Sequence, residues 1–171
     1  METMPSEQTT SNDNFGGSLS SAFLSRVLET YIDIEAPPQQ VWEVLLDFPS
    51  WREWNPFIPS VDGSLVVGER ILIKVVPPGR KPMEFKPEVF VVRPCEEIIW
   101  GGSFLWVMYR GDHAFLLESL PGGGTRFRQR ERFRGPMTLF MTRMIKDTEK
   151  GYYQMNQALK RRVEAKGLHR D

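Results

Sequence analysis

The sequence predicts an α+β domain in which a curved antiparallel sheet of about seven strands wraps around one long C-terminal helix. Residues 137–166 repeat apolar side chains at three- and four-residue steps, which predicts a helix with one apolar face about 40 Å long. Between residues 60 and 135, alternating segments follow one another without a helical pattern, so the sheet is expected to be antiparallel. Two short helical segments follow the first strand and are expected to close one end.

The chain totals favour one globular domain after a flexible tail. A chain of 171 residues, 40% of them hydrophobic, is long enough to bury one core. Residues 1–22 are polar and lack the pattern of a secretory signal, so we expect a disordered tail, with the domain spanning residues 23–171. The single cysteine, Cys95, suits a reducing compartment, and these observations together predict a cytoplasmic protein.

The first ordered elements should be a strand and two short helices. In residues 25–36, apolar and polar side chains alternate, as expected for a strand with one buried face. Pro37 and Pro38 end that strand, and residues 39–48 then carry a helical apolar stripe. A brief helix over residues 51–54 is expected to end at Asn55 and Pro56.

Turn residues divide the middle of the chain into strands. We expect strands between residues 63 and 68, at 69–76, at 83–93 and at 97–104, with a loop at 77–82. Residues 105–120 and 125–135 should form a long hairpin around the turn at 121–124. Pro136 and Gly167 suit the two ends of the terminal helix.

Several motifs, in this order, resemble the START-like (SRPBCC) superfamily, and most of all its polyketide cyclase/dehydrase and coenzyme-Q-binding branch. These motifs are Ile34-Glu35-Ala36-Pro37 with Val41-Trp42, Trp54-Asn55-Pro56-Phe57, Gly111-Asp112-His113-Ala114-Phe115, Thr125-Arg126-Phe127, Glu131-Arg132-Phe133 and Met155-Asn156-Gln157-Ala158-Leu159-Lys160. The resemblance covers residues 25–166 and implies the helix-grip fold with an internal cavity. Since this architecture serves carriers and enzymes alike, function has to be argued from the site.

Alternation in the hairpin predicts a few polar side chains on its inner face. Gln129 and Glu131 share a face with phenylalanines, and His113 should lie opposite either Glu131 or Phe133. One hypothesis makes His113 and Glu131 a catalytic acid–base pair, with Tyr109 or Tyr152 as a third polar partner. The alternative is that these groups satisfy one another, or a trapped water, inside a binding cavity.

The same alternation, with the methionines of the terminal helix, predicts the lining of the cavity. The residues expected to contact a ligand are Phe85, Trp100, Phe104, Tyr109, Phe115, Phe127, Gln129, Phe133, Met141, Met144, Tyr152 and Met155. The loop at residues 77–82 and the pair Gly101–Gly102 are candidates for the rim of the cavity. Gly151 could give a ligand or the facing strand room to approach the helix.

Charge and motif content narrow the functional classes. Twenty-two basic and 22 acidic residues cancel, and the arginines at alternate positions 126–134 should pair with Glu29, Asp33, Glu35, Asp112 and Glu118 on the outer face, which argues against nucleic acid. With one cysteine and two histidines, neither a zinc site nor a nucleotide fingerprint is present, so no metal or cofactor is expected. No stretch approaches the roughly 18 apolar residues of a membrane span.

The leading hypothesis is therefore a monomeric or weakly dimeric protein that binds a small hydrophobic molecule, such as a lipid, a polyketide or an isoprenoid-like compound. The alternative is a polyketide cyclase or dehydratase that uses His113 and Glu131 without a cofactor, although a non-enzymatic function is favoured. A third hypothesis is a regulatory interaction module acting through the outer surface.

Overall fold

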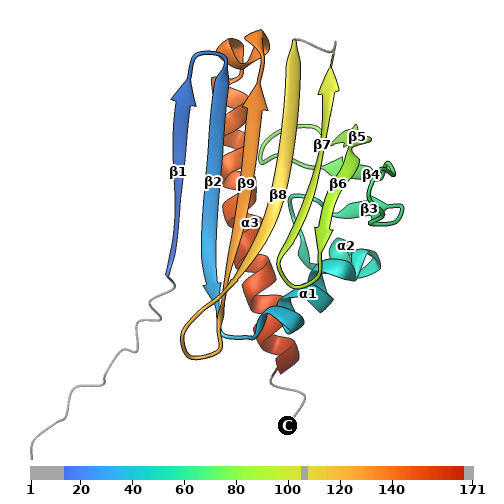
Figure 1. The fold of residues 1–171 in the computed structure, drawn as a ribbon, viewed down its shortest axis with the longest axis vertical. Helices are drawn as coiled ribbons and strands as arrows, with labels where there is room; N and C mark the ends of the chain where they lie inside the picture. Colours follow the sequence, from blue (N-terminus) through green and yellow to red (C-terminus); the bar gives the residue numbers. More distant parts are fainter. Residues whose placement is uncertain (1–13, 105–107, 168–171) are drawn as a thin grey trace, which may run out of the picture.

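The computed structural model describes residues 14–104 and 108–167, and it has one long helix lying along one face of a six-stranded antiparallel sheet (Figure 1). The helix is α3 (Thr142–Gly167). In spatial order the strands are β1 (Phe15–Ala22), β2 (Ser25–Ile34), β9 (Thr125–Arg134), β8 (Tyr109–Ser119), β7 (Glu97–Phe104) and β6 (Glu88–Arg93). The predicted α+β helix-grip architecture is confirmed.

A second, three-stranded sheet lies next to the edge strand β6. It contains β3 (Ser60–Asp62), β4 (Leu72–Val75) and β5 (Met83–Phe85), so the described residues form nine strands where about seven were expected. The difference has a local cause, because the expected strand at 83–93 is interrupted just before Glu88. Pro87 has no N–H to donate to a ladder, and the chain leaves β5 to pair with a different neighbour in β6.

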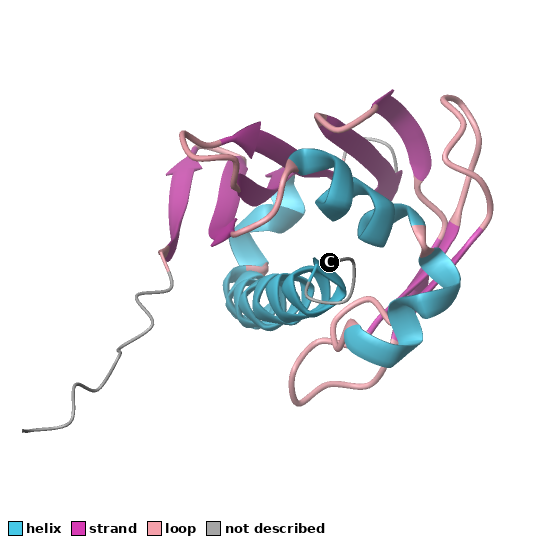
Figure 2. Ribbon diagram, turned by 90° about the horizontal axis from the view of Figure 1, so that it is seen from below, coloured by secondary structure: helices cyan, strands magenta, loops and turns pink. Residues whose placement is uncertain are grey.

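The short helices close one end of the molecule. They are α1 (Pro38–Leu46), the 3₁₀ turn η1 (Phe48–Ser50) and α2 (Trp51–Trp54), and Figure 2 shows them beside α3 seen nearly end-on. The side-chain oxygen of Asn55 accepts hydrogen bonds from the backbone N–H groups of Phe57 and Ile58, at 3.1 and 2.9 Å. This turn holds the Phe57 ring against α3.

The N-terminal segment differs from the expectation of a tail disordered to residue 22. Residues 15–22 form β1, which pairs with β2 in register from Phe15↔Ile32 to Ala22↔Ser25. Small side chains explain how a polar segment joins the sheet, because a Cβ at Gly16 or Gly17 would come within 2.8 Å of Tyr31 or Tyr153. The Phe15 ring also contacts the Tyr153 ring edge to face.

Two further boundaries differ from the sequence expectations. Residues 63–68 are not a strand, and the first short strand is instead β3, just before Gly63, whose φ of 117° turns the chain. The expected helix at 137–166 is also divided, since Pro136–Phe140 forms the 3₁₀ turn η2. That turn is closed where the Met141 N–H donates to the Thr138 carbonyl, and α3 follows it.

The apolar face of α3 supplies one side of the core. Ile145, Tyr152, Met155, Leu159 and Val163 are buried on it. The helix packs mainly against β2, and Tyr152 also contacts His113 of β8 and Gln129 of β9. Gly151 lies on the same face, and a Cβ there would overlap the Phe57 ring. The room at Gly151 is therefore taken by the Phe57 ring from the turn after α2.

The outer face of the sheet carries the predicted arginine stripe and several of its ion pairs. Arg126 contacts Asp33 at 2.7 Å, Arg128 contacts Glu29 and Glu118 at 3.1 and 2.9 Å, and Arg134 pairs with Asp112. Much of the basic stripe is thus neutralised by neighbouring strands, as expected for a solvated paired face.

Candidate functional site

The β8–β9 hairpin gathers polar groups on the inner face of the sheet. His113 lies directly opposite Glu131 in the ladder, which decides the register that the sequence left open. Gln129 lies next along β9 on the same face, and Tyr152 of α3 faces all of these residues from the helix. The strand alternation and the helical spacing therefore converge on one site between sheet and helix.

Glu131 is enclosed by two tyrosines. The Tyr152 hydroxyl donates a short hydrogen bond to the Glu131 carboxylate. Tyr109 reaches the same place because Gly111 has no side chain, since a Cβ on Gly111 would lie 2.5 Å from the Tyr109 hydroxyl and 3.3 Å from Oε1 of Glu131. Both tyrosines named as possible third partners are thus beside the carboxylate.

The surroundings of Glu131 place its titration near neutrality. Burial raises the pKa of Glu131 to about 7, with a smaller contribution from the charge of Asp112, and the Tyr152 hydrogen bond acts in the opposite direction. Burial and the nearby Glu131 charge raise the pKa values of Tyr109 and Tyr152, so both remain neutral donors. The site therefore offers one carboxyl group that exchanges its proton near pH 7 and two phenols that keep theirs.

His113 is held as a neutral ring among aromatic side chains. Its ring stacks on that of Tyr152, with centroids 4.9 Å apart, and meets Trp100 and Phe115 edge to face at 5.7 and 4.6 Å. Burial lowers the pKa of His113 to about 3, and the neighbouring Gln129 amide partly opposes that shift. Its Nε2 atom is buried without a hydrogen-bond partner in the described part of the chain.

A chain of side-chain amides continues from Gln129 toward β2. The Gln129 amide donates to Oδ1 of Asn156 at 2.7 Å, and the Asn156 amide donates to Oγ1 of Thr30 at 3.2 Å. This network fixes the orientation of Gln129 and leaves its Oε1 buried, with no partner among residues 14–104 and 108–167. Sequence reasoning did not assign Asn156 or Thr30 to the site, although Asn156 follows Tyr152 by four residues and so shares its helix face.

Most of the predicted ligand-contacting residues do meet in this interior. Six of their side chains are almost fully buried between the sheet and α3, namely those of Trp100, Phe115, Phe127, Phe133, Tyr152 and Met155. Tyr109 lies partly buried beside Phe133, Met141 is buried near the start of α3, and Met144 is partly buried against the same core.

Two predicted residues do not join them. Phe85 belongs to β5 of the small sheet, and its side chain is 48% exposed, so assigning it to the interior was wrong. The interruption at Pro87 moved this residue from the large sheet to the small one. The side chain of Phe104 lies outside the described residues.

Two pockets on the surface of the described residues are not lined by any predicted ligand-contacting residue. One, of about 670 Å³, lies between the β8–β9 turn and Lys160 of α3. The other, of about 240 Å³, lies along β6 and β7 and includes the predicted rim residues Gly101 and Gly102. The interior rings contact one another at packing distances, so an internal cavity stays a prediction that requires those side chains to move apart.

Two other kinds of feature are not found in the described residues. Within them, no cluster of histidine, cysteine and carboxylate side chains could hold a metal ion. No helix in the same ranges is long and apolar enough to cross a bilayer.

The long helix against a curved antiparallel sheet, with polar groups enclosed between them, defines a START-like helix-grip protein. The family described as polyketide cyclase / dehydrase and lipid transport matches residues 25–164. The chain belongs to this family. Strand β1 precedes the matched region.

Solved structures of similar fold have low sequence identity. Protein Ms6760 from Mycobacterium smegmatis aligns with a TM-score of 0.67 and 16% identity, over 87% of this chain and 98% of that one. Ara h 8.0201 has a TM-score of 0.63 and 14% identity, over 82% and 99%. The di-domain ARO/CYC BexL from the BE-7585A biosynthetic pathway has a TM-score of 0.65 and 13% identity, over 82% and 50%. None of the curated protein sequences matches this chain significantly.

Proposed function

We propose that this protein binds a small hydrophobic molecule between the sheet and α3, with a hydroxyl group of the ligand directed at His113 and Gln129. The observation that carries the proposal is a pair of buried polar atoms, Nε2 of His113 and Oε1 of Gln129, for which the described residues provide no hydrogen bond of good geometry. Gln129 is 0% exposed and His113 is 7% exposed, so bulk water does not serve either group.

The energetic argument concerns those two atoms. A buried polar atom without a partner costs about 1–3 kcal/mol. The Gln129 side chain raises the pKa of His113 through a hydrogen-bond interaction, so the two side chains are neighbours and one ligand group can reach both. A ligand hydroxyl both donates and accepts, so it can donate to Oε1 of Gln129 and accept from the His113 tautomer that carries its proton on Nε2. The surrounding side chains are aromatic or aliphatic, which suits the apolar body of such a ligand.

The direct test is mass spectrometry of an organic-solvent extract of the purified protein. We expect a hydrophobic compound with a polar oxygen, recovered at close to one equivalent per chain. The double variant His113→Phe/Gln129→Leu should retain less of it, while Arg161→Gln on the exposed face of α3 should retain the normal amount. Extracts without any such compound, together with no saturable binding of hydrophobic fluorescent probes, would contradict the proposal.

A second candidate function is cyclisation or dehydration, and the observation that favours it is the Glu131 carboxyl with its pKa of about 7 beside Tyr152. In a dehydration, the Glu131 carboxylate takes a proton from the carbon next to a ligand carbonyl while a tyrosine hydroxyl hydrogen-bonds the enolate oxygen. The proton then passes to the departing hydroxyl, which leaves as water as the carbon–carbon double bond forms.

In that reaction His113 would position the substrate, which differs from the acid–base role that the sequence predicts. With its pKa lowered to about 3 it stays neutral, so it is better suited to positioning the substrate by a hydrogen bond than to carrying a proton. Glu131→Gln should abolish turnover of a β-hydroxy ketone substrate and leave ligand binding intact. Turnover that survives this substitution would remove the enzymatic candidate without affecting the binding proposal.

A further inference from the structure

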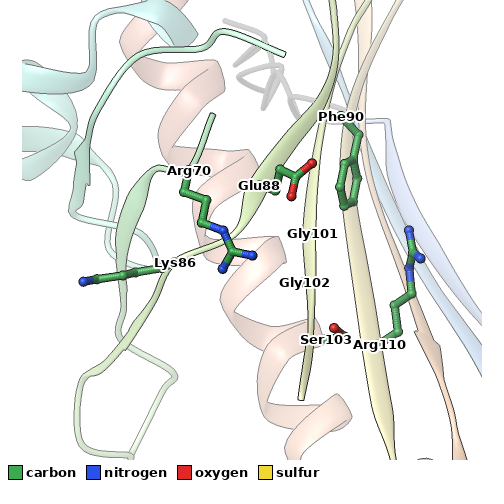
Figure 3. A pocket seen from close by; sticks show the side chains of 8 residues that line it. All are labelled: Arg70, Lys86, Glu88, Phe90, Gly101, Gly102, Ser103 and Arg110. Atoms are coloured by element: carbon green, nitrogen blue, oxygen red, sulfur yellow. The ribbon is translucent and has the colours of Figure 1, made fainter. Parts of the chain in front are cut away.

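The outer face of the sheet carries a basic pocket near the point where the chain passes from the small sheet into β6 (Figure 3). Arg70 and Lys86 approach from the small-sheet side, and Arg110 of β8 lies on the other side of β7. Alternation along β7 separates this pocket from the interior site, because Trp100 faces the core while Gly101 pairs with Asp112 of the outer face. The two sites therefore lie on opposite faces of one strand.

Positive charge exceeds negative charge in this pocket. Arg70, Lys86 and Arg110 line it with one carboxylate, that of Glu88. A second carboxylate, that of Asp112, lies close to Gly101 and is shared between Arg110 and Arg134. Across the described ranges, neither Arg70 nor Lys86 has an ion-pair partner, unlike much of the arginine stripe. Arg110 donates from Nε to Asp112 at 3.2 Å, which orients the guanidinium and leaves its terminal nitrogens as donors.

The backbone around Arg70 is fixed in place. The Gly68 N–H donates to the Val89 carbonyl and the Val89 N–H to the Glu69 carbonyl, each at 2.8 Å, and the Ile71 N–H donates to the Pro87 carbonyl at 3.0 Å. Arg70 consequently forms a β-bridge with Glu88, which anchors its backbone at the edge of β6. These backbone hydrogen bonds therefore fix the position from which the Arg70 side chain enters the pocket.

At the floor of the pocket, Gly101 is closely packed against its neighbours, whereas Gly102 faces open space. A Cβ at Gly101 would overlap the Gly111 carbonyl and lie 2.9 Å from the Phe90 ring, so no larger residue fits without a shift of backbone. The Phe90 ring closes one side, with the Arg110 guanidinium 5.5 Å from its centroid. The floor is therefore formed by the main chain of Gly101 and Gly102, with the Asp112 carboxylate close to Gly101.

We infer that this pocket binds a phosphate monoester that carries a neighbouring hydroxyl group. The cations suit a doubly charged oxyanion, and arginine in particular matches the geometry of phosphate oxygens. The Glu88 carboxylate can only accept hydrogen bonds when ionised, so it favours a ligand hydroxyl over bare phosphate. The volume of about 240 Å³ is below the usual range for drug-sized ligands and suits a small polar molecule.

The test is a titration with inorganic phosphate and with glycerol 3-phosphate, followed by ¹H–¹⁵N NMR at constant ionic strength. We expect saturable shifts at the amides of Gly101, Gly102 and Ser103, with glycerol 3-phosphate binding more tightly than inorganic phosphate. Vesicles of phosphatidylcholine with and without phosphatidic acid show whether a membrane-borne monoester is also bound. Vesicle binding that needs phosphatidic acid would assign the source to lipid, and its absence would assign it to a soluble ester.

Variants make the inference specific to the pocket. Arg70→Gln/Lys86→Gln should weaken glycerol 3-phosphate binding at least about tenfold, because two charge-assisted contacts are lost. The matched pair Lys150→Gln/Arg161→Gln on α3 should leave it unchanged. Glu88→Gln should strengthen inorganic phosphate binding and reduce the preference for the hydroxylated ester. Non-saturable shifts spread over the arginine stripe, or equal affinity in the Arg70/Lys86 variant, would overturn the inference, and neither result bears on the interior site.

Discussion

At Glu131, burial and hydrogen bonding act in opposite directions on the same carboxyl group. Removal from water favours the protonated form, whereas the Tyr152 hydroxyl favours the ionised form, and burial has the larger effect. His113, directly opposite, is buried in its neutral form. The inner face thus carries two groups whose charged forms, a carboxylate and an imidazolium, are both disfavoured in the folded protein.

These pKa shifts predict an unusual dependence of stability on pH. Because the folded pKa of Glu131 is about 7 and its ordinary value is 4.5, the folded state binds the extra proton between these values. The free energy of unfolding should therefore fall as pH rises from about 4.5 to about 7, by up to about 3 kcal/mol from this group. His113 acts oppositely, since its lowered pKa removes stability as pH falls below its ordinary value of 6.5.

Urea unfolding of wild type and Glu131→Gln across pH 4–8 measures the first contribution. The difference in unfolding free energy between the two proteins should change between about pH 4.5 and about pH 7, and it should become constant at higher pH. Glu118→Gln, a substitution on the outer face, should unfold with the wild-type pH profile. A pH-independent difference between wild type and Glu131→Gln would show that Glu131 titrates normally.

At Gly151 of α3, tertiary packing leaves no room for a side chain. Gly151 allows the Phe57 ring to pack directly on the helix, and that ring in turn meets Tyr152 edge to face at 5.4 Å. The amphipathic pattern of the sequence predicted this helix and its buried face. It could not name Phe57 as the neighbour, because that contact depends on the turn held by Asn55 far away in the chain.

Gly151→Ala distinguishes this arrangement from an ordinary helical glycine. At an exposed position alanine would stabilise the helix by about 1 kcal/mol. Here overpacking against Phe57 should outweigh that gain and lower the free energy of unfolding by about 1–3 kcal/mol. The double variant Gly151→Ala/Phe57→Leu should recover part of the loss, whereas Lys150→Ala should be near neutral. Thermal stability raised by Gly151→Ala alone would contradict the close contact.

Over the whole molecule, local sequence patterns predicted the architecture. They failed where the position of a strand depends on its pairing with a distant segment of the chain. Alternation placed His113, Gln129 and Glu131 on the inner face, because a half-buried strand requires it. Phe85 was misplaced because its strand joins a second sheet, and β1 was missed because Gly16 and Gly17 fit only against a tyrosine-bearing neighbour. The pairing of Glu131 with Tyr152 joins β9 to α3, and no local spacing in the sequence specifies it.

The central claim, that a hydrophobic ligand lies between the sheet and α3 with its oxygen at His113 and Gln129, is tested most directly by NMR of the complex. The compound recovered by solvent extraction is added back to the stripped protein, and intermolecular nuclear Overhauser effects are measured. Contacts from the ligand to the ring protons of His113 and Tyr152 and to the Gln129 side chain are predicted. Contacts confined to the outer face of the sheet or to the exposed face of α3 would contradict the account.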